Sequence, residues 1–350
     1  MTVENWQTAW RQLSGPGSPY EVVTPDDGGP RYFRNAQPDL LTALNAGRAH
    51  GEREFVVWED QRLTFAEFFA QVDRLATQLR TRFGVRKGDR VAIAMRNQPA
   101  WLVAFVAAVA SGAIVVPLNS WGQREELLHG LEDSGSRVLL CDAARLALVE
   151  GDLEPLDLQA IAVGAPGQGR WVCDYEALLA EDVALLPPPV FQPDDPLLIL
   201  YTSGTTSKPK GVLSSHRAVC QALAALEFQG AFAAMSSPQR IKAIIDSGFA
   251  PTNLMAVPLF HVSGLHAQFL LALRGGRRLV LMYKWDSERA LDLIERERCT
   301  QFSGSPAMMQ QLLASPRFAS DATASLFGLG LGGAAANPGL LAQLTSVKPN

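Results

Sequence analysis

The stretch LLILYTSGTTSKPKGV, residues 197–212, decides how the rest of the chain is interpreted. Its first four residues form a short apolar run, which is typical of a strand buried on both faces. Ser215 follows as a plausible N-cap for a helix rich in Ala and Leu. Between strand and helix lie hydroxyls, glycines and two lysines. Such a loop can wrap backbone N–H groups around anionic oxygens while lysines add charge, so the stretch predicts a phosphate-binding loop; the alternative is a solvated turn.

Strands and helices alternate along the chain on both sides of this loop. A capping box of Thr64 and Glu67 opens the most clearly marked helix. The other expected helices are 100–110, 123–133, 216–235, 262–273, 287–298 and 306–313. The expected strands are 55–58, 90–94, 113–116, 137–141, 197–200, 254–257, 278–283, 300–303 and 326–331. Alternating elements with apolar strands predict an α/β fold of two successive βα windings, each a parallel sheet covered by helices.

Composition shifts suggest where these windings begin and end. We expect an N-terminal arm at residues 1–30, a first α/β subdomain at 31–186, a Pro-rich linker at 187–196 and a second subdomain at 197–350. The second subdomain would carry the phosphate loop and belong to the same large domain. No internal repeat is apparent.

Composition also limits the function classes. Of 350 residues, 47% are hydrophobic and 19% charged, which allows a sizeable core, and the net charge of -4 argues against nucleic acid as a partner. The four cysteines are scattered, as expected of reduced thiols in the cytoplasm. The first 20 residues lack the apolar core of a secretory signal. Residues 99–118 are uncharged, but Gly112 and Pro117 favour a buried helix and strand over an integral membrane segment.

Several catalytic motifs do not fit. The loop lacks the spacing of a P-loop NTPase, and GLGLGG at 328–333 has the letters of a dinucleotide fingerprint but lies in a strand. No Gly-x-Ser-x-Gly elbow and no His-x-x-x-His pair is present. Instead, three of the expected strands are followed by segments of unusual composition. These segments are the loop, PLFH (258–261) and GGA (332–334). Because ligands bind beyond the carboxyl ends of parallel strands, we expect these three ends to form one site.

Taken together, these motifs resemble the adenylate-forming (ANL) superfamily of acyl-CoA synthetases, the AMP-dependent synthetases and ligases. The loop resembles the phosphate-binding signature of that family. LTFAE (63–67), GDRV (88–91) and GAIVVPLN (112–119) resemble its upstream landmarks in the same order. PLFH resembles its aromatic-His segment and GGAA (332–335) its adenine-binding turn. The resemblance runs from about Leu40 to the end of the chain.

The resemblance implies roles for individual residues. Lys210 and the loop residues would hold the β- and γ-phosphates of ATP, and His261 would lie beside the acyl group and α-phosphate. Gly332 and the turn after it would contact adenine, and Thr202 would touch Mg²⁺. The implied nucleotide-binding residues are Thr202, Ser203, Gly204, Thr205, Thr206, Lys210, Gly332, Gly333, Ala334 and Ala335. The implied substrate-binding residues are His261, Val262, Ser263, Gly264, Gln268 and Ser305.

The resemblance further implies an ATP-dependent carboxylate–CoA ligase with Mg²⁺ and coenzyme A as cofactors. The enzyme would convert a hydrophobic acid, such as one of fatty acid metabolism, into an acyl-adenylate and then a CoA thioester, and a homodimer is compatible with this function. Lys208 is expected to be solvated and His266 to pack. His50, His129 and His216 are expected to be structural.

The sequence departs from the family pattern in three places. Ser207 replaces a common glycine, and Ala336-Asn337-Pro338 replaces the proline that usually follows the adenine turn. The later family motifs and the C-terminal lid domain have no counterpart here, so we expect an N-terminal portion with little activity alone. An adenylation domain that loads a carrier-protein thiol, and a non-catalytic nucleotide-binding remnant, remain open alternatives.

Overall fold

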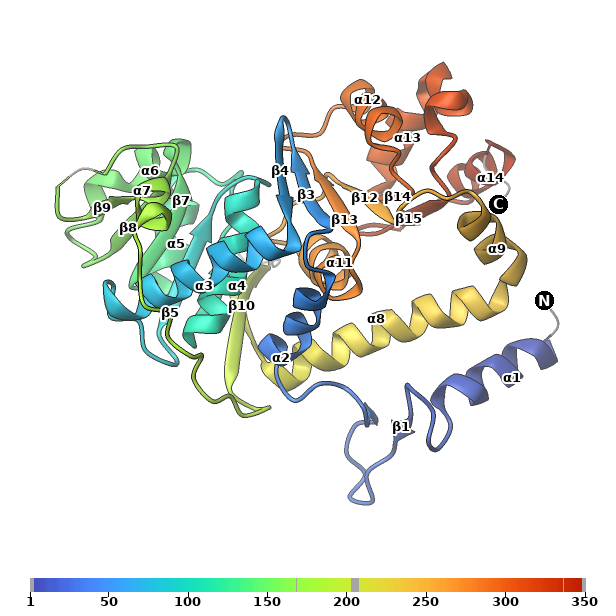
Figure 1. Cartoon of the computed structure of the whole chain (residues 1–350), viewed down its shortest axis with the longest axis horizontal. Coiled ribbons are helices and arrows are strands. Elements are labelled where there is room, and N and C mark those ends of the chain that lie inside the picture. The colour runs from blue at the N-terminus through green and yellow to red at the C-terminus, as the bar shows by residue number, and fades with distance from the viewer. Residues whose placement is uncertain (1–2, 168, 203–207, 336, 348–350) are drawn as a thin grey trace.

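The computed structural model describes residues 3–167, 169–202, 208–335 and 337–347, and its frame is a pair of sheets with helices between and outside them (Figure 1). The first sheet has seven strands in the order β11-β10-β6-β5-β7-β8-β9. They are β5 (Arg90–Ala94), β6 (Ile114–Pro117), β7 (Val138–Asp142), β8 (Gln159–Val163), β9 (Val172–Asp174), β10 (Pro196–Thr202) and β11 (Lys210–Ser215). All neighbours are parallel except β10 and β11.

The second sheet has six strands in the order β15-β14-β12-β13-β3-β4. They are β3 (Glu54–Trp58), β4 (Gln61–Thr64), β12 (Thr252–Met255), β13 (Arg278–Leu281), β14 (Gln301–Gly304) and β15 (Gly328–Leu331). Here β3 and β4 are the antiparallel pair. Each sheet is therefore parallel with one antiparallel hairpin at an edge, and the predicted α/β fold is confirmed.

The sheets do not follow the expected serial order of the two subdomains. β3 and β4 come from the first predicted subdomain yet complete the second sheet, through the pairing of β3 with β13. β10 and β11 come from the second predicted subdomain yet complete the first sheet, through the pairing of β10 with β6. Hydrophobic patterns show which face of a strand is buried but not which strand lies beside it, so this exchange leaves no local signal.

A layer of helices lies between the two sheets and holds the largest apolar core. Its centre is α4 (Pro99–Ser111), all of whose residues are buried, as predicted for this uncharged stretch. Trp101 and Phe105 of α4 stack with ring centroids 5.6 Å apart, and both meet Phe269 edge-on. Other helices around this core include α2 (Leu40–Asn45), η1 (Ala46–His50), α3 (Phe65–Thr81), α7 (Tyr175–Ala180), η3 (Leu265–Leu270), α11 (Leu271–Gly275) and the first half of α8 (His216–Ser236).

Two outer layers cover the remaining faces. One packs on the seven-stranded sheet and comprises α5 (Arg124–Ser134), α6 (Ala143–Val149) and η2 (Glu150–Asp152). The other packs on the six-stranded sheet and comprises α12 (Ser287–Glu297), α13 (Pro306–Ala314), η4 (Pro316–Ala319), η5 (Asp321–Thr323) and α14 (Pro338–Val347). Successive residues along a strand therefore point alternately into the central core and into an outer core, because side chains in a strand alternate between the two faces of the sheet.

The N-terminal residues lie along the longest helix. α8 (His216–Ser236) extends from the body, and α1 (Val3–Ser14) runs beside it (Figure 1). The ring of Trp10 meets Phe228 of α8 edge-on at 4.8 Å. The expected arm therefore contains a helix, followed by the short pair β1 (Val22–Val23) and β2 (Tyr32–Phe33). α9 (Pro238–Asp246) follows α8, and α10 (Val262–Gly264) precedes η3.

Among the described residues, one helix, α8, has the length and hydropathy of a membrane-crossing segment. Its N-terminal half packs on the protein, because His216, Val219, Cys220, Leu223, Ala224 and Phe228 are buried.

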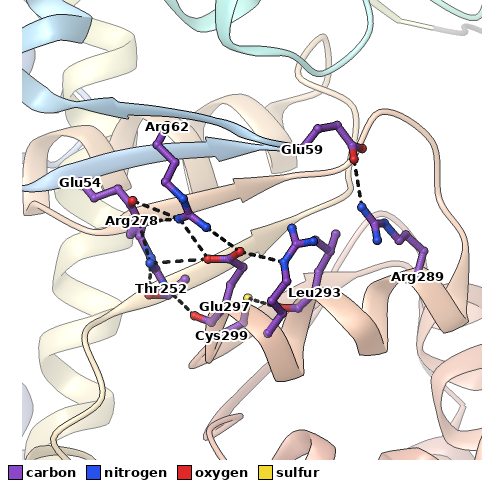
Figure 2. Close-up of polar contacts among 10 residues, drawn as sticks. Glu54, Glu59, Arg62, Thr252, Arg278, Arg289, Leu293, Glu297 and Cys299 are labelled. Atoms are coloured by element: carbon purple, nitrogen blue, oxygen red, sulfur yellow. Dashed lines mark hydrogen bonds and ion pairs between the residues drawn. The ribbon is translucent and has the colours of Figure 1, made fainter.

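A cluster of ion pairs ties the β3–β4 hairpin to the second sheet at the amino ends of its parallel strands (Figure 2). Arg278, the first residue of β13, contacts Glu54 of β3 at 2.6 Å. Arg62 of β4 contacts both Glu54 and Glu297, each at 3.0 Å. Burial alone would raise the pKa of Glu297, but the hydrogen bonds from Arg62 and Arg296 and the charges of Arg62 and Arg278 outweigh it, and the pKa is lowered. Because this edge is opposite the strand ends where ligands bind, we assign the cluster to stability.

Candidate functional site

The legs of the predicted phosphate loop are the paired strands β10 and β11. Thr202 and Lys210 face each other as the last residues of this antiparallel pair, and both are exposed. Residues after Pro209 were predicted to lie in the loop up to Val212, but they form β11 instead. Ser203, Gly204, Thr205 and Thr206 lie outside the described residues. The paired strands of the hairpin therefore end at two exposed residues, Thr202 and Lys210.

Helix α5 holds both legs of this hairpin. The hydroxyl of Tyr201 donates to Asp133 Oδ2 at 2.7 Å. Nε2 of His129 donates to the carbonyl oxygen of Pro209 at 2.9 Å. Burial and the nearby Asp133 carboxylate raise the pKa of Tyr201, so the phenol stays protonated as a donor. His129, expected to be structural, thus contacts the loop directly, which no sequence signal indicated.

A pocket of about 80 Å³ connects the hairpin with His261. Its lining comes from the ends of three segments and from α5: Pro117, Leu118, Asn119, Glu126, His129, Gly130, Tyr201, Pro209, Phe260 and His261. The structure therefore brings His261 to the legs of the phosphate loop, at the carboxyl ends of the strands. Desolvation by the surrounding protein lowers the pKa of His261 below its usual 6.5, so the imidazole is neutral at pH 7.

Asn97 positions the segment that carries His261, and sequence reasoning missed it. Its side-chain amide donates to the carbonyl of Val257 at 3.0 Å and its oxygen accepts from the N–H of Leu259 at 3.1 Å. Asn97 follows β5 of the first sheet, while the segment follows β12 of the second. One buried amide therefore fixes the two strand ends to each other. An Asn placed just after a buried strand and before a helix was the only available signal.

The residues expected to line the acyl pocket divide into exposed and buried members. Val262 is exposed and Ser263 is half-buried, whereas Gly264 and Gln268 are buried. The amide nitrogen of Gln268, Nε2, donates to the carbonyl oxygens of Ser263 and Ser303, at 3.3 and 3.4 Å. The expected helix over 262–273 contains a π-helical segment at η3, a geometry frequent at functional sites.

Gly264 has no room for a side chain. A Cβ there would lie 2.3 Å from the carbonyl oxygen of Pro258. The glycine therefore allows the helix after His261 to pack against the strand end before it. Ser305, the other expected pocket residue, caps α13 by accepting from the N–H of Met308 at 3.3 Å.

The predicted adenine turn follows β15 at the carboxyl edge of the second sheet. The N–H of Gly332 donates to the carbonyl of Gly304 at 3.1 Å, which places the turn beside the start of α13. Gly333 has a φ of +80°, a conformation that favours glycine. Gly333, Ala334 and Ala335 are exposed, so a planar ring can approach the backbone there.

The described contacts thus collect the expected residues into two adjoining groups. Lys210, Thr202 and His261 gather around the hairpin, and Gln268, Ser303, Ser305 and the turn at 332–335 gather around the end of β14. The segment 261–268 joins the groups, because His261 belongs to one and Gln268 to the other.

Thr202 is the described residue that fits the implied magnesium ion. Mg²⁺ takes oxygen ligands and usually keeps waters and substrate phosphates beside one or two protein groups. An exposed hydroxyl at the loop's first residue satisfies that requirement. Within the described ranges, no group of three or more His, Cys, Asp or Glu side chains is placed to hold a metal ion.

The profile of the family described as AMP-binding enzyme matches residues 44–350. The chain therefore belongs to the AMP-binding enzyme family.

Individual relatives agree with this assignment. The chain is 35% identical over 267 residues to the indoleacetate–CoA ligase of Aromatoleum aromaticum, which is 75% of this chain and 49% of that protein. It is 34% identical over 276 residues to a feruloyl-CoA synthase of Amycolatopsis, covering 78% and 49%. Among solved structures, it is similar to the inhibitor-bound N-terminal domain of FACL13 from Mycobacterium tuberculosis, with a TM-score of 0.73, 26% identity and coverage of 89% and 73%. The chain spans about half the length of the curated relatives it matches.

Proposed function

We propose that this chain is the nucleotide- and acyl-binding part of an ATP-dependent carboxylate–CoA ligase. The observation that carries the proposal is the pocket that joins His261 to both legs of the phosphate hairpin. The ligase would join a carboxylate to the α-phosphate of ATP, release pyrophosphate, and pass the acyl group from AMP to the thiol of CoA. Cytoplasmic ATP and CoA would supply this reaction.

The first half-reaction brings a carboxylate against a polyphosphate, so cationic groups must offset the repulsion. The ammonium of Lys210, at the start of β11, would provide one positive charge beside the β- and γ-phosphates. The N–H groups of Ser203, Gly204, Thr205 and Thr206 would surround the same phosphates. Mg²⁺ bound near Thr202 would neutralise further phosphate charge. His261, as a neutral imidazole, would donate a hydrogen bond to the reacting oxygens. Because the ring carries no charge, it would not draw the carboxylate away from the phosphorus atom.

The turn of Gly332, Gly333, Ala334 and Ala335 would receive the adenine ring. Val262, Ser263, Gly264, Gln268 and Ser305 would surround the acyl group. None of these five residues is charged, which favours a hydrophobic acid. The two relatives above are named after indoleacetate and ferulate, which are aromatic acids of that kind.

The experiment that tests the proposal is calorimetric titration of the chain with ATP and Mg²⁺. Loss of one charge-assisted contact should weaken ATP binding about tenfold in Lys210→Ala. Lys242→Ala is the matched control, because the Lys242 side chain is 75% exposed and pairs with Asp246 on its own helix. Equal ATP affinity of the wild type and Lys210→Ala would contradict the assigned role. In a catalytically active ligase that contains this chain, the same substitution should lower acid-dependent pyrophosphate exchange.

A further inference from the structure

A groove lies near the amino ends of the first sheet's strands, on the side away from the pocket that contains His261. Ala110, near the end of α4, lines this groove and precedes β6, whereas Pro117 and Leu118 line the pocket at the other end of that strand. The four residues of β6 separate the groove from the pocket by about 13 Å. The groove is therefore not part of the site described above.

The groove has the size of a site for a small organic molecule, with a volume of about 510 Å³. It is formed by α2, α3, the end of α4 and the linker that runs from α7 to β10 (Figure 1). Leu41, Ala76 and Ala110 form a buried floor, whereas Leu185 and Leu186 of the linker are 57% and 42% exposed. The groove therefore offers an apolar floor and an apolar wall that solvent can reach.

Hydrogen bonds from α3 hold the linker that forms this wall. The N–H of Leu186 donates to Thr77 Oγ1 at 3.2 Å. Nη1 of Arg80, one turn further along the same helix, donates to the carbonyl oxygen of Pro187. Because both contacts involve the linker backbone, they set the distance between wall and floor and leave the leucine side chains available to a ligand.

The rim of the groove carries an excess positive charge. Arg48 is neutralised by Asp73, whose carboxylate oxygens accept from its Nη1 and Nη2 at 3.0 and 2.6 Å. Arg80 lies on the same rim, and within the described part of the chain it forms no ion pair. The contact with Pro187 uses one of the five N–H donors of a guanidinium, so Arg80 can also bind an anion.

We propose that this groove binds a small hydrophobic carboxylate, with its carboxylate on Arg80 and its apolar part between the buried floor and the linker. Charge complementarity selects an anion, because Arg80 supplies the excess charge of the rim. The apolar floor and wall select a hydrocarbon or aryl body, since they would be removed from water together with it. The proposal is independent of the ligase function, although its ligand belongs to the class of acid proposed above. The protein would thus hold such an acid at a second, non-catalytic place.

The test is calorimetric titration of the chain with decanoate, and with decanol as the uncharged analogue. We expect Arg80→Gln to weaken decanoate binding in the groove about tenfold, because a charge-assisted contact is lost, and Arg80→Lys to weaken it less. Decanol should bind the wild type and Arg80→Gln equally. Arg82→Gln is the matched control, because Arg82 lies two residues further along, carries the same charge and pairs with Glu181 at 2.7 Å outside the groove.

A second variant tests the wall without changing the arginine. Leu185→Asp places a negative charge beside the ligand, and because Leu185 is 57% exposed the substitution should leave the core intact. We expect it to weaken decanoate binding about tenfold as well, by repulsion and by loss of apolar contact. It also keeps the proposal testable if Arg80→Gln does not fold, which a circular dichroism melt of each variant shows.

Decanoate bound beside His261 would not contact these residues, so the same affinity and stoichiometry in wild type, Arg80→Gln and Leu185→Asp would overturn the proposal. Absence of decanoate binding, or an equal loss in Arg82→Gln, would overturn it too. Sedimentation separates the other occupant: a wild-type dimer that Leu185→Asp dissociates and decanoate does not affect would assign the groove to a second copy of the chain instead. Failure of the ligase proposal is read separately, from ATP titration of Lys210→Ala.

Discussion

Nε2 of His129 lies 2.9 Å from the carbonyl oxygen of Pro209, which can only accept a hydrogen bond. The ring of His129 therefore carries its proton on Nε2, and helix α5 holds the second leg of the β10–β11 hairpin. The first leg is held one turn further along the same helix, where Asp133 accepts from the hydroxyl of Tyr201. A single helix thus contacts both legs of the hairpin.

Replacing His129 tests this arrangement. His129→Ala removes the donor and leaves the Pro209 carbonyl without its partner, so we expect ATP affinity to fall about three- to tenfold. His129→Gln keeps an N–H donor at similar reach and should retain most of the affinity. The measurement is ATP titration of both variants. Equal loss in the two variants would show that the ring's packing against Tyr201, and not the hydrogen bond, is what matters.

Gly264 offers a test of the segment after His261. A Cβ at Gly264 would lie 2.3 Å from the Pro258 carbonyl oxygen, so Gly264→Ala must displace the backbone that carries His261. We expect a loss of about 2 kcal/mol or more in the free energy of unfolding, together with weaker acyl-adenylate binding.

The control for this prediction is Gly275→Ala, near the end of α11, where an added Cβ has open space. It should be neutral or slightly stabilising in chemical denaturation, because alanine loses less backbone entropy on folding than glycine. If both alanine variants unfold at the same denaturant concentration, the close approach to Pro258 is not a constraint.

The sequence predicted those features of helices and strands that depend on residues close together in the chain. The capping box was confirmed in both directions: Glu67 N–H donates to Thr64, and the Thr64 N–H donates to Glu67. Gly112 ends α4 with a φ of +91°, as a left-handed C-cap requires. The strand before His261 was likewise visible as a short apolar run and is buried. The strand before the loop, β10, was expected to be buried on both faces, but only Leu197 and Leu198 are buried in it.

What the sequence could not predict depends on partners distant in the chain. The pairing of β3 with β13 joins residues more than 200 positions apart, and neither strand encodes the other's identity. The contact of His129 with Pro209 has the same origin, since it exists only because α5 packs beside β10 and β11. β11 was missed because Gly, Val and Ser after the lysines resemble a loop when their antiparallel partner is unknown. The roles of Lys210, His261 and the turn at 332–335 remain predictions.

His266 gives the chain a pH dependence of stability. Burial lowers the pKa of this side chain from 6.5 to about 4. Between those values the unfolded chain binds a proton that the folded chain does not, so stability falls as pH falls from 6.5 to 4. The full loss from this one group is about 3 kcal/mol. His266→Gln should have a flatter unfolding free energy over this range, measured by urea denaturation at several pH values, and should run parallel to the wild type above pH 7.

The ion-pair cluster around Glu297 predicts a second, more acidic transition (Figure 2). Glu297 is 4% exposed and contacts Arg62 and Arg296 at 3.0 Å, with Arg278 at 3.7 Å. Since its pKa is lowered in the folded state, its contribution is complete above the unfolded value near 4.5 and is lost as pH falls through the folded value. Glu297→Gln removes the charge but keeps the shape.

We expect Glu297→Gln to cost about 1–3 kcal/mol at pH 7, because three arginines lose a buried partner, although two of them are partly solvated. Glu295→Gln is the control: Glu295 lies on the same helix, is about half exposed and pairs with Arg317 at 3.1 Å. Its effect should stay below about 0.5 kcal/mol. Urea denaturation at pH 7 and pH 4 separates the cases, because the gap between wild type and Glu297→Gln should narrow at the lower pH. A gap that stays constant would mean that packing, not charge, explains the cost.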